Sequence, residues 1–184
     1  MPRGETVEPA EPGRVLVAGV TGVGKTTLAK TIAEAIGSPY VELDALYHGP
    51  QWSYRDSFLD EVAEIATTDR WVTEWQYASA RPILADRAQL LVWLDLPTPV
   101  MLWRLVRRTI RRRLRREVLW NGNREAPLWH FLTGRDHVLA WALRSGRTYR
   151  ELVPQAAAAH PGLTVVRLRT QREVDRWLRT LPAG

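Results

Sequence analysis

The 184-residue sequence contains no cysteine, which excludes disulfide bonds and thiolate metal centres. Histidine is also scarce, and the four scattered copies do not have the spacing of a zinc site. No apolar stretch approaches the length needed to cross a membrane. The sequence therefore predicts a protein that is held together by packing alone.

The length and composition limit the number of domains. With 184 residues, of which 45% are hydrophobic, the chain can bury one substantial core and is short for two, so one α/β domain is expected. Residues 1–13 are rich in Pro, Glu and Gly and lack the apolar segment of a signal peptide. We expect a disordered tail over 1–13, a single domain over 14–184, and a cytoplasmic location.

Lysine is almost absent as well: only Lys25 and Lys30 are lysines among the 26 basic residues. Lys25 belongs to the run Gly-Val-Thr-Gly-Val-Gly-Lys-Thr at 19–26, directly behind the apolar stretch 15–18. This pattern is typical of a phosphate-binding loop (P-loop) between a strand and a helix. Its glycines let backbone N–H groups turn toward phosphates, and the helix start adds its positive end. The alternative is a glycine-rich turn that binds no ligand.

A nucleoside triphosphate and Mg²⁺ are the ligands that this loop predicts. We expect Lys25 to reach the phosphates and the hydroxyl of Thr26 to bind Mg²⁺. The helix that follows should end at Gly37. The residues of this segment expected to bind the nucleotide are Gly22, Val23, Gly24, Lys25, Thr26 and Thr27.

Apolar runs alternate with helical patterns along the chain. Strands are predicted at 14–18, 40–43, 71–73, 90–94 and 163–168. Helices are predicted at about 25–36, 57–67, 136–152 and 171–181, with an arginine-rich helix and a mobile crossing after residue 97. This alternation favours a parallel, doubly wound sheet with helices on both faces.

Three acidic residues follow predicted strands, and ligands of such sheets bind beyond the carboxyl ends of the strands. Asp44 is a candidate general base or binder of an acceptor hydroxyl, with a turn or helix cap as the alternative. Glu74 is a candidate for organising Mg²⁺, with a buried pair to an arginine as the alternative. Asp95 follows the most apolar strand, but just before Pro97 it is expected to cap the arginine-rich helix.

Arginines are concentrated on one predicted helix. On a helical wheel one face carries Arg104, Arg107, Arg108, Arg111 and Arg115. Cations gathered on one face repel each other, and a polyphosphate opposite them offsets that repulsion. We therefore expect Arg104 to bind the nucleotide and Arg108, Arg111 and Arg115 to act on the transferring group. A solvated face paired with acids and a nucleic-acid-binding face are the alternatives.

Several aromatic side chains near the predicted strand ends could line a flat acceptor pocket or pack in the core. They are Tyr47, His48, Trp52, Trp75 and Tyr77.

Several stretches together resemble the adenylate-kinase-like P-loop kinases, in particular the bacterial branch called topology modulation proteins or FlaR-like proteins. The matching stretches are GVTGVGKTTLA at 19–29, ELDALYHGPQW at 42–52, RWVTEWQY at 70–77, ADRAQLLVWLDLP at 85–97, RLVRRTIRRRLRREVLWNGNRE at 104–125 and VVRLRTQREVDRWL at 165–178. The resemblance implies a P-loop NTPase fold with a five-stranded parallel sheet and an arginine-rich helical lid at about 104–135. It also implies that Arg172 and its neighbours border the adenine and that Asp44 faces the acceptor.

One departure from that branch concerns the third strand, where Glu74-Trp75 replaces the usual Asp-Gly. The extra methylene of Glu74 and the bulky indole of Trp75 change the pocket, which bears on how the metal is bound and on which acceptor fits. The resulting hypothesis is ATP- and Mg²⁺-dependent phosphoryl transfer to a small-molecule acceptor, such as a nucleotide or a nucleotide-like metabolite. The alternative is an ATP-binding regulatory or nucleic-acid-associated ATPase. Neither the acceptor nor the oligomeric state follows from the sequence.

Overall fold

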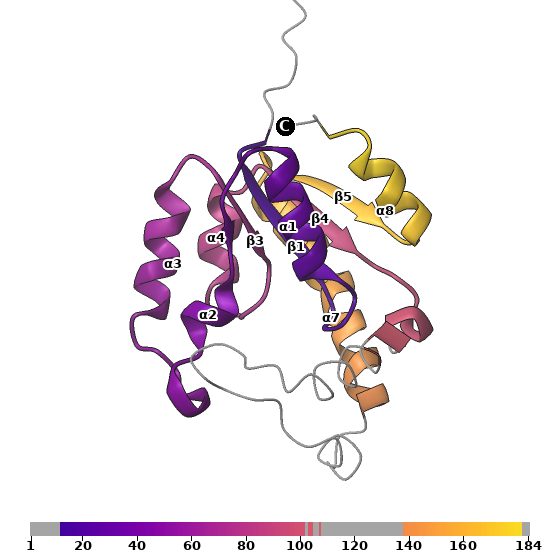
Figure 1. The fold of residues 1–184 in the computed structure, drawn as a ribbon, viewed down its shortest axis with the longest axis horizontal. Coiled ribbons are helices and arrows are strands. Elements are labelled where there is room, and N and C mark those ends of the chain that lie inside the picture. Colours follow the sequence, from indigo (N-terminus) through magenta and orange to yellow (C-terminus); the bar gives the residue numbers. More distant parts are fainter. Residues whose placement is uncertain (1–11, 102, 105–106, 108–137, 182–184) are drawn as a thin grey trace, which may run out of the picture.

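A five-stranded, all-parallel sheet forms the centre of the molecule, as the alternation and the resemblance predicted (Figure 1). The computed structural model describes residues 12–101, 103–104, 107 and 138–181, with side chains described from 148 onward in the last range. The strand order is β2-β3-β1-β4-β5. The strands are β1 (Arg14–Gly19), β2 (Tyr40–Val41), β3 (Trp71–Glu74), β4 (Leu90–Leu94) and β5 (Thr164–Leu168).

The three central strands, β3, β1 and β4, are apolar because both faces of the sheet are covered. Every residue of β3 and β4 is buried, and β1 is buried from Val15 onward. Val17 of β1 is in register with Glu74 of β3 and with Val92 of β4. This register places the end of β3 beside the loop that leaves β1.

Helices surround the sheet, with α1 in front of it and α7 passing behind it (Figure 1). The helices are α1 (Lys25–Ala35), α2 (Leu43–Tyr47), the 3₁₀ turn η1 (Pro50–Trp52), α3 (Phe58–Thr67), α4 (Arg81–Arg87), α7 (Val138–Ala159) and α8 (Gln171–Leu178). Residues 98–101, 103–104 and 107 are also helical. Among the described residues, no helix has the length and apolar character needed to span a bilayer.

The core lies on both faces of the sheet and contains large, fully buried side chains. Helix α3 shows how the pattern works, because Phe58, Val62 and Ala66 follow one another at four-residue spacing and all three are buried. Trp71 and Leu91 contribute fully buried side chains from β3 and β4. Packing of this kind stabilises the fold of a chain that has no cysteine for disulfide bonds.

The second strand is shorter than predicted. It ends at Val41, and Glu42 is the N-cap of α2 in an extended conformation. The prediction that Asp44 ends a strand is wrong, because Asp44 lies in the first turn of α2. A carboxylate in that turn faces the positive end of the helix, which favours the helix over a longer strand.

The predicted disordered tail and helical lid fall largely outside the described residues. Gly13, assigned to the tail, is already packed: its N–H donates to Gln89 Oε1 at 2.8 Å and its carbonyl accepts from the Trp71 N–H at 2.9 Å. Of the predicted lid, about 104–135, only Arg104 and Arg107 are described. The remainder of the lid stays a prediction.

Candidate active site

The loop between β1 and α1 has a backbone that only glycine adopts easily. Gly22 and Gly24 have φ angles of 82° and 110°. Gly24 is the N-cap of α1 and makes no side-chain cap, while Val23 is fully buried and anchors the loop to the core. The first amides of a helix have no partner within the helix, so this end of α1 suits an anion.

Four polar side chains meet at the end of β3. The hydroxyl of Thr26 donates to Glu74 Oε1 at 2.6 Å, and the hydroxyl of Tyr40 donates to the same oxygen at 3.2 Å. Lys25 Nζ lies 4.0 Å from Glu74 Oε2, and the side chains of Lys25 and Glu74 are only 8% and 6% exposed. Among the residues that the structure describes, the cation beside Glu74 is Lys25 and not the arginine of the predicted alternative.

Burial raises the pKa of the Tyr40 hydroxyl far above its usual value, and the nearby carboxylates of Glu74, Glu42 and Asp44 raise it further. The neutral hydroxyl is therefore a stable hydrogen-bond donor to Glu74 over the whole neutral range. Together with the contacts from Thr26 and Lys25, this hydrogen bond holds the Glu74 side chain in place at the end of β3.

The donors at this point fit Mg²⁺. A hydroxyl and a carboxylate oxygen only 2.6 Å apart, Thr26 Oγ1 and Glu74 Oε1, are hard oxygen ligands of the kind that Mg²⁺ takes together with phosphate oxygens and water. The described residues contain no cluster of three or more His, Asp or Glu side chains that could hold a metal alone. Two such donors suit an ion that takes its remaining ligands from phosphate and water.

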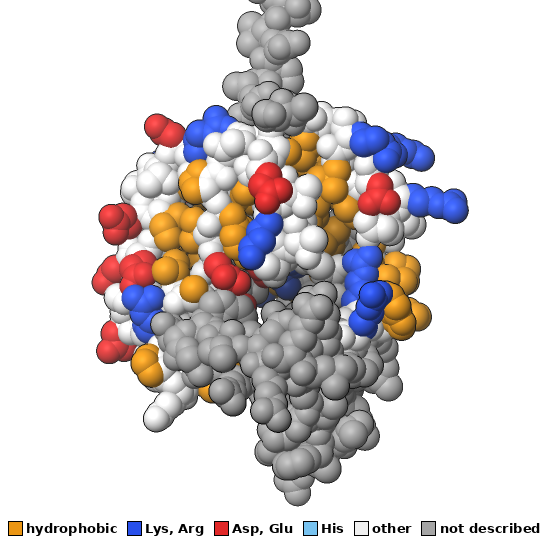
Figure 2. All heavy atoms as spheres, in the orientation of Figure 1, with side chains coloured by type: hydrophobic (Ala, Val, Ile, Leu, Met, Phe, Trp, Pro, Cys, Tyr) orange, Lys and Arg blue, Asp and Glu red, His pale blue; other side chains and the backbone are white. Residues whose placement is uncertain are grey.

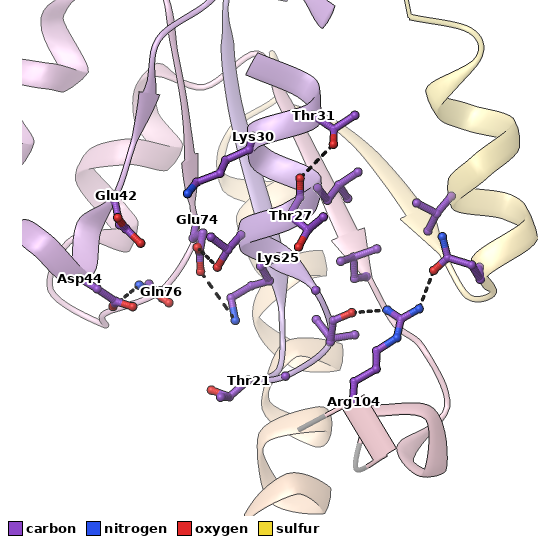
Figure 3. Close-up of a pocket in the computed structure, with 18 of the residues that line it drawn as sticks. Thr21, Lys25, Thr27, Lys30, Thr31, Glu42, Asp44, Glu74, Gln76 and Arg104 are labelled. Atoms are coloured by element: carbon purple, nitrogen blue, oxygen red, sulfur yellow. Dashed lines mark hydrogen bonds and ion pairs between the residues drawn. The ribbon is translucent and has the colours of Figure 1, made fainter. Parts of the chain in front are cut away.

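A second polar cluster surrounds Asp44 (Figure 3). Asp44 Oδ1 accepts hydrogen bonds from Gln76 Nε2 at 2.6 Å and from the Tyr77 hydroxyl at 2.5 Å. The Tyr77 oxygen is also 3.3 Å from His48 Nε2. Burial, followed by the hydrogen bond to Asp44, raises the pKa of Tyr77 well above its usual value. These contacts fix one carboxylate oxygen of Asp44, and a carboxylate has further acceptor positions.

Residues of both clusters, Lys25, Thr26 and Glu74 from the first and Asp44, Gln76 and Tyr77 from the second, line one cavity of about 1230 Å³. In Figure 3, Asp44, Glu42 and Gln76 lie on one side of Lys25, and Arg104 lies on the other. The lining includes the loop residues 21–27, the acids Glu34, Glu42, Asp44 and Glu74, and Trp52, Trp103 and Gln171. All six loop residues predicted to bind the nucleotide are in this lining. The cavity is large enough for a nucleotide and a second small molecule.

Arg104 connects the loop to α8. Its Nη1 donates to the carbonyl of Val23 at 2.7 Å, and its Nη2 donates to Gln171 Oε1 at 2.6 Å. A Cβ atom on Gly24 would lie 3.3 Å from the same guanidinium, so this glycine also permits the close approach. Arg172, by contrast, is exposed and outside the lining, whereas its neighbour Gln171 is inside it. An adenine contact by Arg172 stays a prediction.

Asp95 does not line the cavity. It forms ion pairs with Arg167, whose guanidinium lies over the ring of Trp93, and with Arg150 at 3.7 Å. These contacts identify a structural role in joining β4, β5 and α7. The predicted catalytic residues Arg108, Arg111 and Arg115 lie outside the described residues.

Trp75 is one of the aromatic residues that packs in the core. It is 3% exposed, and its Nε1 donates to the carbonyl of Arg81, whose guanidinium lies 5.5 Å from the indole ring. The Trp75 carbonyl accepts from the Tyr149 hydroxyl at 3.1 Å. The Trp75 side chain therefore packs away from the cavity, and its backbone carbonyl joins the end of β3 to α7.

Sequence reasoning missed Tyr40 and Gln76 as site residues. Gln76 follows Glu74 by two positions, and this place just past a predicted strand end is the signal that could have identified it. Tyr40 opens the second strand and reaches Glu74 of β3 across the sheet, which no position at a strand's carboxyl end indicates.

Charged side chains of both signs are visible on this face of the molecule (Figure 2). Acidic side chains gather over α3, whereas basic side chains are prominent on the side of α8 (Figure 2). The described cavity lies between these two regions and contains both signs.

Comparison with known proteins is consistent with this fold. Residues 15–68 match the family described as "ATPase family associated with various cellular activities (AAA)". A gluconokinase from Sinorhizobium meliloti has a similar structure, with a TM-score of 0.52 and 22% identity over 91% of this chain and 92% of that one. A shikimate kinase from Acinetobacter baumannii in complex with shikimate has a TM-score of 0.55 and 16% identity over 92% and 90%.

No curated protein matched the sequence. The narrower resemblance to the topology modulation branch stays a prediction. The loop, the strand order and these structural neighbours together show that the chain has a P-loop NTPase fold, with a five-stranded parallel sheet flanked by helices.

Proposed function

We propose that this protein transfers the γ-phosphoryl group of ATP, with Mg²⁺, to a hydroxyl group of a small molecule. The observation that carries the proposal is the meeting of Lys25, Thr26 and Glu74 at one end of a cavity that has Asp44 further along its wall. The first group suits a metal-bound triphosphate, and the second suits an attacking hydroxyl. The kinase neighbours, which are named for gluconate and shikimate, support an acceptor of small size.

Each residue has a role in that reaction. Lys25 and the loop amides would bind the β- and γ-phosphates and stabilise their negative charge. Thr26 and Glu74 would hold Mg²⁺, which neutralises charge on the phosphates. Asp44 would orient the acceptor hydroxyl and accept its proton. The acceptor oxygen forms a bond to the γ-phosphorus as the bond to the β-γ bridging oxygen breaks, and ADP leaves.

Arg104 is placed to support the nucleotide half of the cavity. It joins the loop to Gln171 at the start of α8, and these two hydrogen bonds hold its guanidinium at the cavity wall. We infer that Arg108, Arg111 and Arg115 add positive charge to the transferring group, as their sequence pattern indicates.

The test is transfer of label from ATP labelled at the γ-phosphate. The protein is incubated with labelled ATP, Mg²⁺ and a panel of sugars, sugar acids, nucleosides and nucleotides, and the products are separated. The proposal predicts a labelled organic phosphate with at least one acceptor, and a loss of about 100-fold in kcat for Asp44→Asn. Label that appears only as inorganic phosphate, at a rate raised by DNA and by no acceptor, would favour the nucleic-acid-associated ATPase instead.

A further inference from the structure

The half of the cavity beyond Lys25 contains carboxylates. Glu42 and Asp44 line this half, and Lys30 is the labelled cation on the same side of α1 (Figure 3). The amine of Lys30 lies 5.3 Å from the centre of the Tyr40 ring. Arg104 and Arg107 line the opposite half. The described wall of the acceptor half therefore carries net negative charge.

Trp52 adds an exposed aromatic ring to the cavity wall. Trp52 lines the cavity with 43% of its surface exposed. It lies in η1, where Gln51 and Trp52 have left-handed φ angles of 55° and 60° without being glycine. The chain thus holds a large apolar side chain at the cavity edge in a conformation that most residues avoid.

Contacts join this ring to the carboxylate expected to act as the base. The ring centres of Trp52 and His48 are 5.0 Å apart, His48 Nε2 is 3.3 Å from the Tyr77 oxygen, and Tyr77 donates to Asp44. Tyr77 is itself held by stacking on Tyr47, with 4.0 Å between ring centres. Trp52 and Asp44 are therefore parts of one connected wall.

We propose that the acceptor is an uncharged, polyhydroxylated ring compound that stacks on Trp52 and donates hydroxyl hydrogen bonds to Glu42 and Asp44. This inference rests on the proposed phosphoryl transfer and names the class of its acceptor. Carboxylates accept hydrogen bonds from hydroxyls and repel anionic groups, while the indole covers the apolar face of a ring. Sugar acids and nucleotides, which carry negative charge, fit this wall less well.

The experiment compares acceptors in matched pairs that differ in charge. Glucose is paired with gluconate, inositol with shikimate, and a nucleoside with its monophosphate, each with labelled ATP and Mg²⁺. The inference predicts that the neutral member of at least one pair is phosphorylated with a kcat/KM at least 10-fold above that of its anionic partner. If only anionic members are phosphorylated, phosphoryl transfer stands and the acceptor class is wrong. If no member is phosphorylated, the acceptor class is contradicted, and the wider acceptor panel above decides separately on phosphoryl transfer.

Variants test the two wall residues separately. Trp52→Ala should raise KM for the acceptor about 10-fold, and Trp52→Phe, which keeps an aromatic face, should restore most of it. Glu42→Lys should lower the preference for the neutral member of a pair about 10-fold. Trp103→Ala removes an exposed tryptophan from the other half of the cavity and should affect KM for ATP rather than for the acceptor. An unchanged acceptor KM in Trp52→Ala, with the protein folded by circular dichroism, would overturn the stacking role.

Discussion

Lys25 is the residue on which nucleotide binding depends most directly. Its ammonium is 8% exposed and lies beside Glu74, at the point where the loop meets α1. We predict that Lys25→Met raises the Kd for ATP by roughly 10-fold or more, the equivalent of about 1.4 kcal/mol, because a charge-assisted contact to phosphate is lost. Isothermal titration calorimetry measures the change.

Lys30→Met is a matched control, because Lys30 is the only other lysine in the chain and lines the same cavity. Its amine lies over the Tyr40 ring, on the acceptor side, so its loss should change the Kd for ATP by less than about 3-fold. Equal effects of the two substitutions would show that Lys25 has no special role in phosphate binding.

Tyr40 and Tyr77 predict how stability depends on alkaline pH. The pKa of each is raised in the folded state above the unfolded value of 10.0. Unfolding above pH 10 therefore releases protons, so the free energy of unfolding should fall as pH rises beyond that point. Urea titrations at several pH values should show a shallower fall for the double variant Tyr40→Phe/Tyr77→Phe. An identical slope in both proteins would contradict the hydrogen-bonded, neutral tyrosines.

Some site residues were predictable and others were not. The motif identified Lys25 and Thr26 because the spacing of a phosphate loop is specific. Asp44 was identified as a site residue, but its helix was not, since a five-residue helix is too short to show periodicity. Tyr40 reaches Glu74 through a contact between neighbouring strands, which no local pattern in the sequence reveals.

Helix α8 begins with a side-chain N-cap at Thr170. The hydroxyl of Thr170 accepts from the N–H of Glu173 at 3.2 Å, and Glu173 Oε2 accepts in turn from the Arg169 N–H at 2.6 Å. We predict that Thr170→Ala lowers the free energy of unfolding by about 1 kcal/mol, whereas Thr170→Ser loses much less. Chemical denaturation checks this. Equal stability of the alanine and serine variants would show that the cap contributes nothing.

Strand and helix prediction succeeded where elements are long and apolar. The strand predicted at 90–94 is confirmed as β4 with the same bounds. Five consecutive large apolar residues are typical of a strand that is covered on both faces. Helix α4 was missed because it has seven residues and its signal, a proline near its start, is weak. Helix α7 runs on to Ala159 through Pro154, beyond the predicted end at 152.

Ligand binding should stabilise the whole molecule, because the loop, α1, β3 and α8 all contribute to the cavity wall. With ATP and Mg²⁺ at 100 times the Kd, binding should add about 2.7 kcal/mol to the free energy of unfolding, or roughly 5–10 °C in Tm. Differential scanning fluorimetry measures this shift. It should be largely absent in Lys25→Met, and an equal shift in that variant would contradict binding at the loop.

The most direct measurement is a crystal structure of the protein with a non-hydrolysable ATP analogue and Mg²⁺. We predict that the β- and γ-phosphates lie against the backbone amides of residues 22–27 with Lys25 beside them, and that Mg²⁺ is held by the Thr26 hydroxyl on the side of Glu74. An analogue that binds elsewhere, or the absence of an analogue at residues 22–27 when the ligand is saturating, would contradict the phosphate site. It would also contradict the phosphoryl transfer inferred from that site.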